Sequence, residues 1–273
     1  MKILVPIDFT PVTENALKYS IGLTETLDVS DIILFHVVAS EKDSPSASGK
    51  LNDLIQKYKE QTKVRIESLV KPGNIFDRIG STASEINAAL IVMATHGIKG
   101  MQRILGSKAM KVITNSDTAY IVVQQKSYSQ IKKILVPVDY THEVKQILPL
   151  LQSLNDKFKA TFHLITEEAK DDFIKNKIRN NHMYFKSFLD ENAITYAEAG
   201  SYIGSSKYKD VLKHANTTQA DLIVTTIDPE TNITDYIMGV EEQKLVANES
   251  QIPVLCVNIK QIMNRRANFF ELI

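Results

Sequence analysis

The sequence predicts an α/β fold built from two tandem domains, each a five-strand parallel sheet with helices on both faces. Two observations predict this fold. An internal repeat divides the chain into halves, and within each half short apolar runs alternate with amphipathic segments. Strands that are apolar throughout and alternate with helices are typical of parallel sheets covered on both faces.

The internal repeat consists of four pairs of similar segments that occur in the same order in both halves. They are KILVPID from Lys2 and KILVPVD from Lys133, Phe35–Val37 and Phe162–Leu164, Leu90–Val92 and Leu222–Val224, and YIVV from Tyr120 with VLCV from Val254. Matches in a conserved order indicate a duplicated domain. The polar stretch 127–131 separates the copies, so we predict domains at 1–127 and 131–260 and a C-terminal tail at 261–273.

The first copy contains five apolar runs that predict strands, at Ile3–Ile7, Ile32–Val38, Val64–Val70, Leu90–Ala94 and Ala119–Val123. The last strand of each copy would leave an apolar sheet edge, and such an edge must be paired or covered. We therefore expect the two copies to pair along these strands as an internal pseudo-two-fold dimer. The sequence leaves open whether whole chains also form a homodimer.

Helices are predicted where apolar residues recur at spacings of three and four. Such a pattern runs from Val12 to Leu27, and Thr10 and Pro11 are suited to begin it as cap and first residue. Further patterns are centred on Ile75–Ile86, Ala109–Ile113 and, in the second copy, Val144–Leu154. The polar, Ser-rich segment Ser40–Lys50 instead predicts a mobile connection.

Composition narrows the class of protein. Basic and acidic residues number 32 each, so no global charge favours nucleic acid or a membrane as a partner. The single cysteine, Cys256, excludes an intramolecular disulfide and is expected to be a buried strand residue. No apolar stretch approaches the roughly 20 residues that span a bilayer, and the N-terminus lacks a signal-peptide core. We therefore predict a cytoplasmic protein.

The segment ATHGIKGMQRILGS, from Ala94 to Ser107, has the properties of a phosphate-binding loop. Its glycines allow backbone N–H groups to approach a ligand closely, and Ser107 stands where a helix is predicted to begin. Between Ala94 and Lys111 the chain carries four basic residues and no carboxylate. This loop is predicted to attract an anion.

Together, VPID at the first strand, FHV at the second and ATHGIKGMQRILGS after the fourth resemble the universal stress protein family. The resemblance implies a Rossmann-like or flavodoxin-like sheet with ATP, with or without Mg²⁺, at the carboxyl ends of the strands. It implies that Pro6, Asp8 and Val37 border the base and ribose, that Met93 and Ala94 lie beneath them, and that Gly97, Gly106, Ser107 and Lys108 meet the phosphates.

The loop departs from the family pattern Gly-x2-Gly-x9-Gly-Ser/Thr at two points. Ala94 replaces the first glycine, and the spacer between Gly97 and Gly106 is eight residues long, one short of the pattern. Both changes favour the alternative that this glycine-rich loop has only a structural role and binds no nucleotide. Asp8 likewise has an alternative role, because an Asp at a strand end often holds a turn or caps a helix.

The corresponding segment of the second copy has the opposite charge. It has a single glycine, Gly239, and five carboxylates, which are Asp228, Glu230, Asp235, Glu241 and Glu242. Acidic groups around a phosphate site oppose binding. The second copy is therefore predicted to have lost its nucleotide site.

The remaining candidate residues do not form a catalytic or metal site. His36 and His163 fall at equivalent places in the repeat, which indicates a packing or hydrogen-bonding role, and the histidines lack metal-ligand spacing. The leading hypothesis is a stress-response regulator that binds ATP or a related adenine nucleotide in its N-terminal domain and acts on an unidentified protein partner. An interaction scaffold without nucleotide is the alternative, and a weak ATPase is the third.

Overall fold

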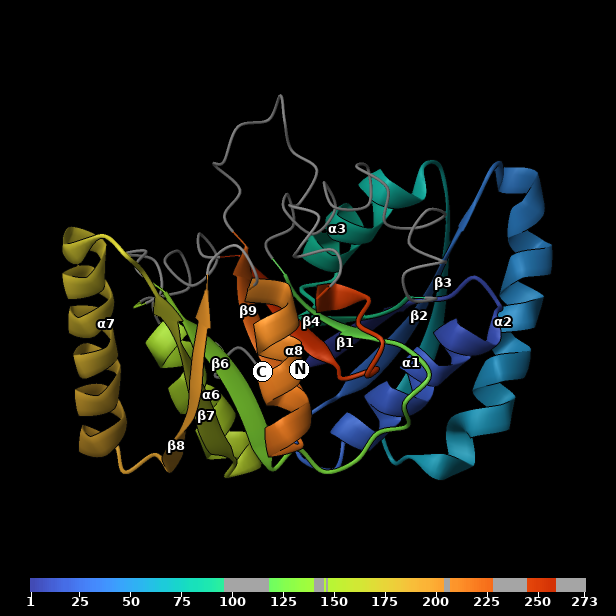
Figure 1. Ribbon diagram of the computed structural model, residues 1–273. Helices are drawn as coiled ribbons and strands as arrows, with labels where there is room; N and C mark the ends of the chain where they lie inside the picture. Colours follow the sequence, from blue (N-terminus) through green and yellow to red (C-terminus); the bar gives the residue numbers. More distant parts are fainter. Residues whose placement is uncertain (96–117, 140–144, 146, 204–206, 228–244, 259–273) are drawn as a thin grey trace.

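The computed structural model describes residues 1–95, 118–139, 145, 147–203, 207–227 and 245–258. These residues form one ten-stranded sheet with the strand order β3-β2-β1-β4-β5-β10-β9-β6-β7-β8 (Figure 1). The order reads the same outward from the central β5–β10 pair, so each half is a five-strand unit of identical topology. The predicted α/β fold of two tandem units is confirmed, and each half has the strand order of a Rossmann-like domain.

The strands of the first half are β1 (Lys2–Pro6), β2 (Asp31–Val38), β3 (Arg65–Pro72), β4 (Leu90–Ala94) and β5 (Ala119–Val123). Those of the second half are β6 (Lys133–Val138), β7 (Thr161–Glu168), β8 (Tyr196–Ile203), β9 (Leu222–Ile227) and β10 (Val254–Asn258). The helices are α1 (Pro11–Leu23), α2 (Ser44–Tyr58), α3 (Ile75–Glu85), α6 (Leu148–Phe158), α7 (Asp172–Glu191) and α8 (Lys207–Thr218). Short 3-10 turns, η1 (Glu41–Asp43) and η2 (Lys59–Gln61), flank α2.

Two apolar layers hold the helices to the sheet, one on each face. Alternate strand residues point to opposite faces, so each strand contributes to both layers. One layer joins the sheet to α1, α2, α6 and α7, and includes Leu17, Leu51, Leu151 and Phe185. The other layer joins it to α3 and α8. The helices therefore cover both faces, with α2 and α7 at opposite ends of the molecule (Figure 1).

The two halves are joined by strand pairing and by a chain of buried polar side chains. β10 pairs with β5 in antiparallel register, Cys256 opposite Tyr120, whereas the other described strand pairs are parallel. The Asn15 amide donates to the Gln124 carbonyl oxygen at 2.7 Å, and the Gln124 amide donates to the Asn248 carbonyl oxygen at 2.6 Å. The predicted pairing of the two copies is thus present within one chain.

Two sequence predictions about local structure are wrong. The segment Ser40–Lys50 is not a mobile connection, because it forms η1 and the first half of α2. α2 buries Ala47, Leu51 and Tyr58, which lie four and seven residues apart on one narrow face. The hydroxyl of Thr10 also does not cap α1, although Thr10 is the N-cap residue. It donates instead to Asp8.

The strand register also corrects the predicted equivalence of His36 and His163. Lys2 pairs with Asp31, and its repeat counterpart Lys133 pairs with Thr161. Counted from these pairs, His36 corresponds to Thr166, and His163 corresponds to Ile33. The two histidines therefore point to opposite faces of the sheet. His36 Nδ1 lies 2.6 Å from the Ile7 carbonyl oxygen, a structural contact that the second half does not repeat.

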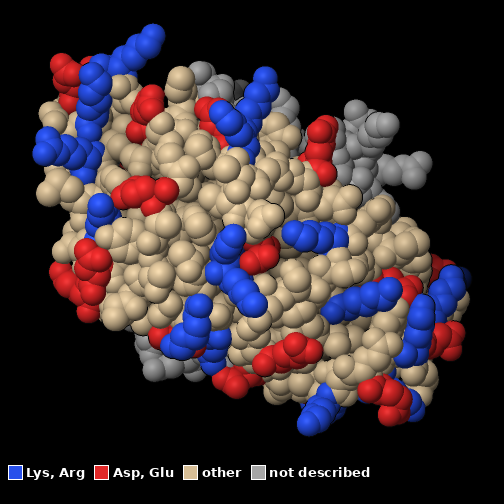
Figure 2. Space-filling view, turned by 60° about the horizontal axis from the view of Figure 1, so that its bottom comes forward, with Lys and Arg blue, Asp and Glu red and all other residues tan. Residues whose placement is uncertain are grey.

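The surface mixes charges of both signs, as expected for a chain with no net charge. Figure 2 shows Lys and Arg side chains interspersed with Asp and Glu over the face that it presents. Among the described helices, none combines the length and apolar character needed to cross a membrane.

Candidate functional site

The strand order places a crevice at the carboxyl ends of β1 and β4. From β1 the chain crosses over to β2 on one side, whereas β4 and β5 lie on the other side. Connections that leave neighbouring strands in opposite directions open a crevice between them, and open α/β sheets bind ligands there. The residues that follow β1 and β4, namely Ile7, Asp8 and Thr95, are therefore the first candidates for a site.

A small cavity lies at this point. Its volume is about 40 Å³, and its lining comes from Pro6, Ile7, Asp8 and Thr13 around the start of α1, Ile75 and Ile79 on α3, and Met93 and Ala94 on β4. Pockets for small ligands typically measure roughly 300–1,000 Å³. The cavity is therefore smaller than a typical ligand pocket, and Ile75, in the first turn of α3 along its wall, is 37% exposed.

The carboxylate of Asp8 organises the turn between β1 and α1. Its Oδ1 accepts hydrogen bonds from the Thr10 backbone N–H at 2.9 Å, the Thr10 hydroxyl at 2.6 Å and the Thr13 hydroxyl at 2.8 Å. Phe9, between them, has a φ of 66°, a left-handed conformation that is uncommon for a bulky residue. These hydrogen bonds show that Asp8 stabilises the turn. This structural role does not depend on any contact between Asp8 and a nucleotide base.

The predicted site residues divide into three groups. Pro6, Asp8, Met93 and Ala94, which come from β1, β4 and the turn after β1, line the one cavity. Val37 does not line it, but packs against the apolar layer on the same face of the sheet. The predicted phosphate-binding residues lie outside the described residues. They are Gly97, Gly106, Ser107 and Lys108.

Sequence reasoning missed other residues at this crevice. Thr13, Ile75 and Ile79 line the cavity, and the motif contains none of them. Thr95 is 2% exposed, and its hydroxyl has no hydrogen-bond partner within the described part of the chain. A buried hydroxyl without a partner is rare in proteins. In the sequence, the position of Thr95 directly after the fourth apolar run could have marked it as a residue of the crevice.

The equivalent crevice of the second half has different chemistry. Asp139 replaces Asp8, and its carboxylate lies 3.5 Å from the ammonium group of Lys207. By strand register, Glu167 stands where the first half has Val37, and Thr225 and Thr226 stand where it has Met93 and Ala94. A carboxylate therefore replaces an apolar side chain beside this crevice. The predicted acidic residues from Asp228 to Glu242 lie outside the described residues.

Comparison with known proteins gives a consistent result. Residues 1–124 match the model of the Universal stress protein family. A universal stress protein from Methanocaldococcus jannaschii is 29% identical over 139 residues, which is 45% of this chain and 82% of that protein. The crystal structure of a universal stress protein from Archaeoglobus fulgidus shares 16% identity and covers 94% of this chain and 96% of that one, with a TM-score of 0.74.

One solved relative holds a nucleotide. A universal stress protein family protein from Arabidopsis thaliana was crystallised with AMP bound. It is 17% identical, covers 48% of this chain and 95% of its own, and gives a TM-score of 0.35. It shows that a family member can bind an adenine nucleotide, and it says nothing about this chain.

Proposed function

We propose that the chain, whose residues 1–124 match the Universal stress protein family, binds ATP or a related adenine nucleotide in its N-terminal domain and acts as a cytoplasmic stress-response regulator. The observation that carries the proposal is the cavity between β1 and β4. It lies at the crevice where open α/β sheets bind ligands, and Pro6, Asp8, Met93 and Ala94 line it. The resemblance alone implied these same residues for the base and ribose.

The proposed site divides into an apolar part for the base and a cationic part for the phosphates. Met93, Ala94 and Ile79 are buried and offer apolar contact to a base. The segment that continues from β4 carries Lys99, Arg103 and Lys108 among its glycines, with no acid before Lys111. Backbone N–H groups and cations together are the usual means of holding phosphates.

The proposed mechanism is regulatory. Binding at the crevice fixes the glycine-rich segment that follows β4 and so alters a surface that a partner protein recognises. A ligand shifts such an equilibrium only by its difference in affinity for the two states. The second half contributes the other side of the ten-stranded sheet and needs no nucleotide for that role.

Isothermal titration of the full chain with ATP tests the proposal. We expect saturable binding that Gly106→Asp abolishes, because a carboxylate at a phosphate site repels the ligand. Gly239→Asp in the second half is the matched control and should leave ATP affinity unchanged. Circular dichroism of both variants checks that they fold. No heat of binding at millimolar ATP with folded wild-type protein would refute the proposal.

One observation favours the alternative of an interaction scaffold without nucleotide. The cavity of about 40 Å³ is far below the roughly 300–1,000 Å³ of typical small-ligand pockets. In that case ATP should neither bind nor raise the thermal midpoint, and Ile79→Ala, which enlarges the cavity, should not create affinity. A weak ATPase is the third candidate, and release of phosphate from ATP by the purified chain would support it.

A further inference from the structure

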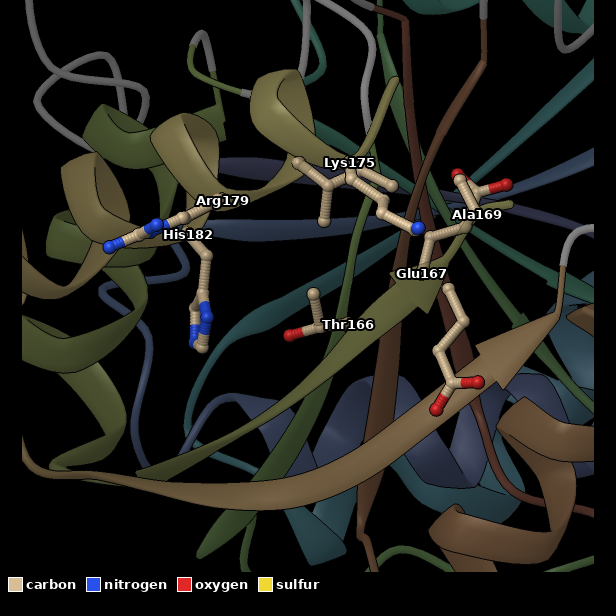
Figure 3. Close-up of a pocket in the computed structure, with 8 residues that line it drawn as sticks. Thr166, Glu167, Ala169, Lys175, Arg179 and His182 are labelled. Carbon is tan, nitrogen blue, oxygen red and sulfur yellow. The ribbon is translucent and has the colours of Figure 1, made fainter. Parts of the chain in front are cut away.

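The second half has a groove between β7 and α7, on the face of the sheet away from α8. Its volume is about 470 Å³, within the range of small-ligand sites. The end of β7 from Thr166 and the following Ala169 form one wall, and Lys175, Ile178, Arg179 and His182 on α7 form the other (Figure 3). This groove is separate from the crevice at β6 and β9, where the repeat would place a second nucleotide.

In the first half, larger side chains occupy the corresponding place. The register makes His36 the counterpart of Thr166. The His36 ring lies 4.6 Å from the Phe9 ring, and the ammonium group of Lys50 lies 5.4 Å from the centroid of Phe9. Thr166 is much smaller than His36, which accounts for part of the space above β7.

The smaller residue leaves a polar atom without a partner. The Thr166 hydroxyl is buried and makes no hydrogen bond within the described part of the chain. Figure 3 shows Thr166 on the side of β7 that faces α7, with the His182 ring nearby. Because a buried hydroxyl without a hydrogen-bond partner is unfavourable, a ligand that bonds to Thr166 would recover part of that cost.

The charges around the groove favour an anion. Lys175 and Arg179 lie one helical turn apart on α7. Lys175 pairs with Asp172 at 2.9 Å, and Asp172 is 91% exposed, whereas Arg179 forms no ion pair with any described residue. Glu167 contributes to the lining, but Figure 3 shows its carboxylate on the opposite side of β7 from Thr166. Glu168 accepts a hydrogen bond from Ser201, and among the described lining residues it places a carboxylate on the groove side of β7. Lys175 and Arg179 therefore supply two permanent positive charges beside the Glu168 carboxylate, since the exposed pair of Lys175 with Asp172 is weak and can be exchanged for a ligand.

Glu198, which lies close to His182, is paired with the ammonium group of Lys186. Its two carboxylate oxygens lie 3.2 Å from the ammonium group of Lys186 and 3.1 Å from Nε2 of His182. The His182 contact is close but is not aligned as a hydrogen bond. This carboxylate therefore adds little negative potential to the groove.

We propose that the groove between β7 and α7 binds a small molecule through its oxyanion group, either a phosphate or a carboxylate. The Thr166 hydroxyl donates to one oxygen, and Lys175 and Arg179 supply the compensating charge. Arg179 extends away from Thr166 in Figure 3, so its exposed side chain swings toward the ligand on binding. Ile178 and Ala169 contact the uncharged remainder of the molecule.

The test is an amide NMR titration of the full chain carrying Gly106→Asp, which disables the proposed phosphate loop of the first half. Inorganic phosphate and acetate are added in separate titrations up to about 10 mM, since millimolar affinity is within reach of a few polar contacts. We expect one of them to shift the amides of residues 166–169 and 175–182 saturably. The probe that binds more tightly identifies phosphate or carboxylate as the ligand group.

Four variants locate the site. Lys175→Gln and Arg179→Gln should each weaken binding about tenfold, the usual effect of losing a charge-assisted contact. Thr166→Val should weaken it several-fold, and Thr166→His, the residue of the first half, should abolish it. Lys177→Gln is the control, because Lys177 lies over the Phe173 ring and not in the groove. It should bind normally.

Three results would overturn the proposal. The first is that neither probe shifts the amide signals saturably. The second is that Lys177→Gln weakens binding as much as Lys175→Gln or Arg179→Gln does. The third is that folded Thr166→Val and Arg179→Gln both keep full affinity. The proposal is independent of nucleotide binding. Thr166→His in the otherwise wild-type chain should therefore leave ATP affinity unchanged.

Discussion

Asn248 lies at the joint between the two halves, where its backbone carbonyl accepts from Gln124, and it is 0% exposed to solvent. Its amide group donates to the carbonyl oxygens of Leu245 at 2.9 Å and Ile252 at 2.8 Å. Its Oδ1 accepts from the Ile252 backbone N–H at 3.0 Å. Asn248→Ala removes all three bonds while keeping the backbone carbonyl that Gln124 contacts.

The cost of Asn248→Ala follows from these contacts. A hydrogen bond contributes about 0.5–1.5 kcal/mol net, and a buried group left without a partner costs about 1–3 kcal/mol. Three lost bonds in a site without solvent access therefore predict a loss of about 3–5 kcal/mol in the free energy of unfolding. Stability of a typical domain is only about 5–15 kcal/mol, so the effect is large.

Equilibrium urea unfolding, followed by circular dichroism and by tyrosine fluorescence, measures this loss. The control is Asn216→Ala, since the Asn216 amide makes an exposed hydrogen bond to Ser250 at 2.8 Å and should change stability by less than about 0.5 kcal/mol. Both probes should report one transition, because the sheet continues through the joint. A loss below about 1 kcal/mol for Asn248→Ala would refute the reasoning.

Two further predictions concern Cys256 and the contact of Gly22 with Tyr128, which lies in the segment between β5 and β6. Gly22→Ala should lower the free energy of unfolding by about 1–3 kcal/mol, because a Cβ there would lie 2.2 Å from the Tyr128 ring. Thermal denaturation measures this loss. In a chain that also carries Tyr128→Ala, Gly22→Ala should cost much less stability. Burial raises the pKa of Cys256 to about 12, so its thiol should not react with a thiol reagent at pH 8 in the folded chain and should react at once in denaturant. Rapid labelling of the native protein would show that the strand is not buried as described.

Much of the fold could be predicted from the sequence, because the repeat indicates two similar domains and the apolar runs indicate the buried strands. A strand buried on both faces, such as Leu90–Ala94, needs an unbroken apolar run, and its bounds were predicted correctly. The joint could be predicted because an apolar last strand in each copy requires a partner. Cys256 was correctly predicted as a buried strand residue for the same reason.

The register of the second strand could not be predicted in the same way. Apolar strands contain few distinctive side chains from which their register can be predicted. Aligning the similar triplets Phe35–Val37 and Phe162–Leu164 therefore placed the two copies three residues away from their true register. The hydrogen-bonded partners of Lys2 and Lys133 set the true register. α2 was missed because its serines masked a narrow apolar face formed by Ala47, Leu51 and Tyr58.

The candidate site was only partly accessible to sequence reasoning. Motif residues at the ends of β1 and β4 lie together because parallel strands end at the same edge of the sheet. The contribution of α3, through Ile75 and Ile79, depends on how that helix packs, and no local motif encodes it. The groove above β7 depends in part on a difference between the copies at Thr166, which becomes visible only once the register is known.

The most direct test of the central claim is a crystal structure of the full chain grown with ATP. We expect one nucleotide per chain, at the carboxyl ends of β1 and β4 and against Met93 and Ala94, with none at β6 and β9. A nucleotide in the second half, or two empty crevices at saturating ATP, would contradict it.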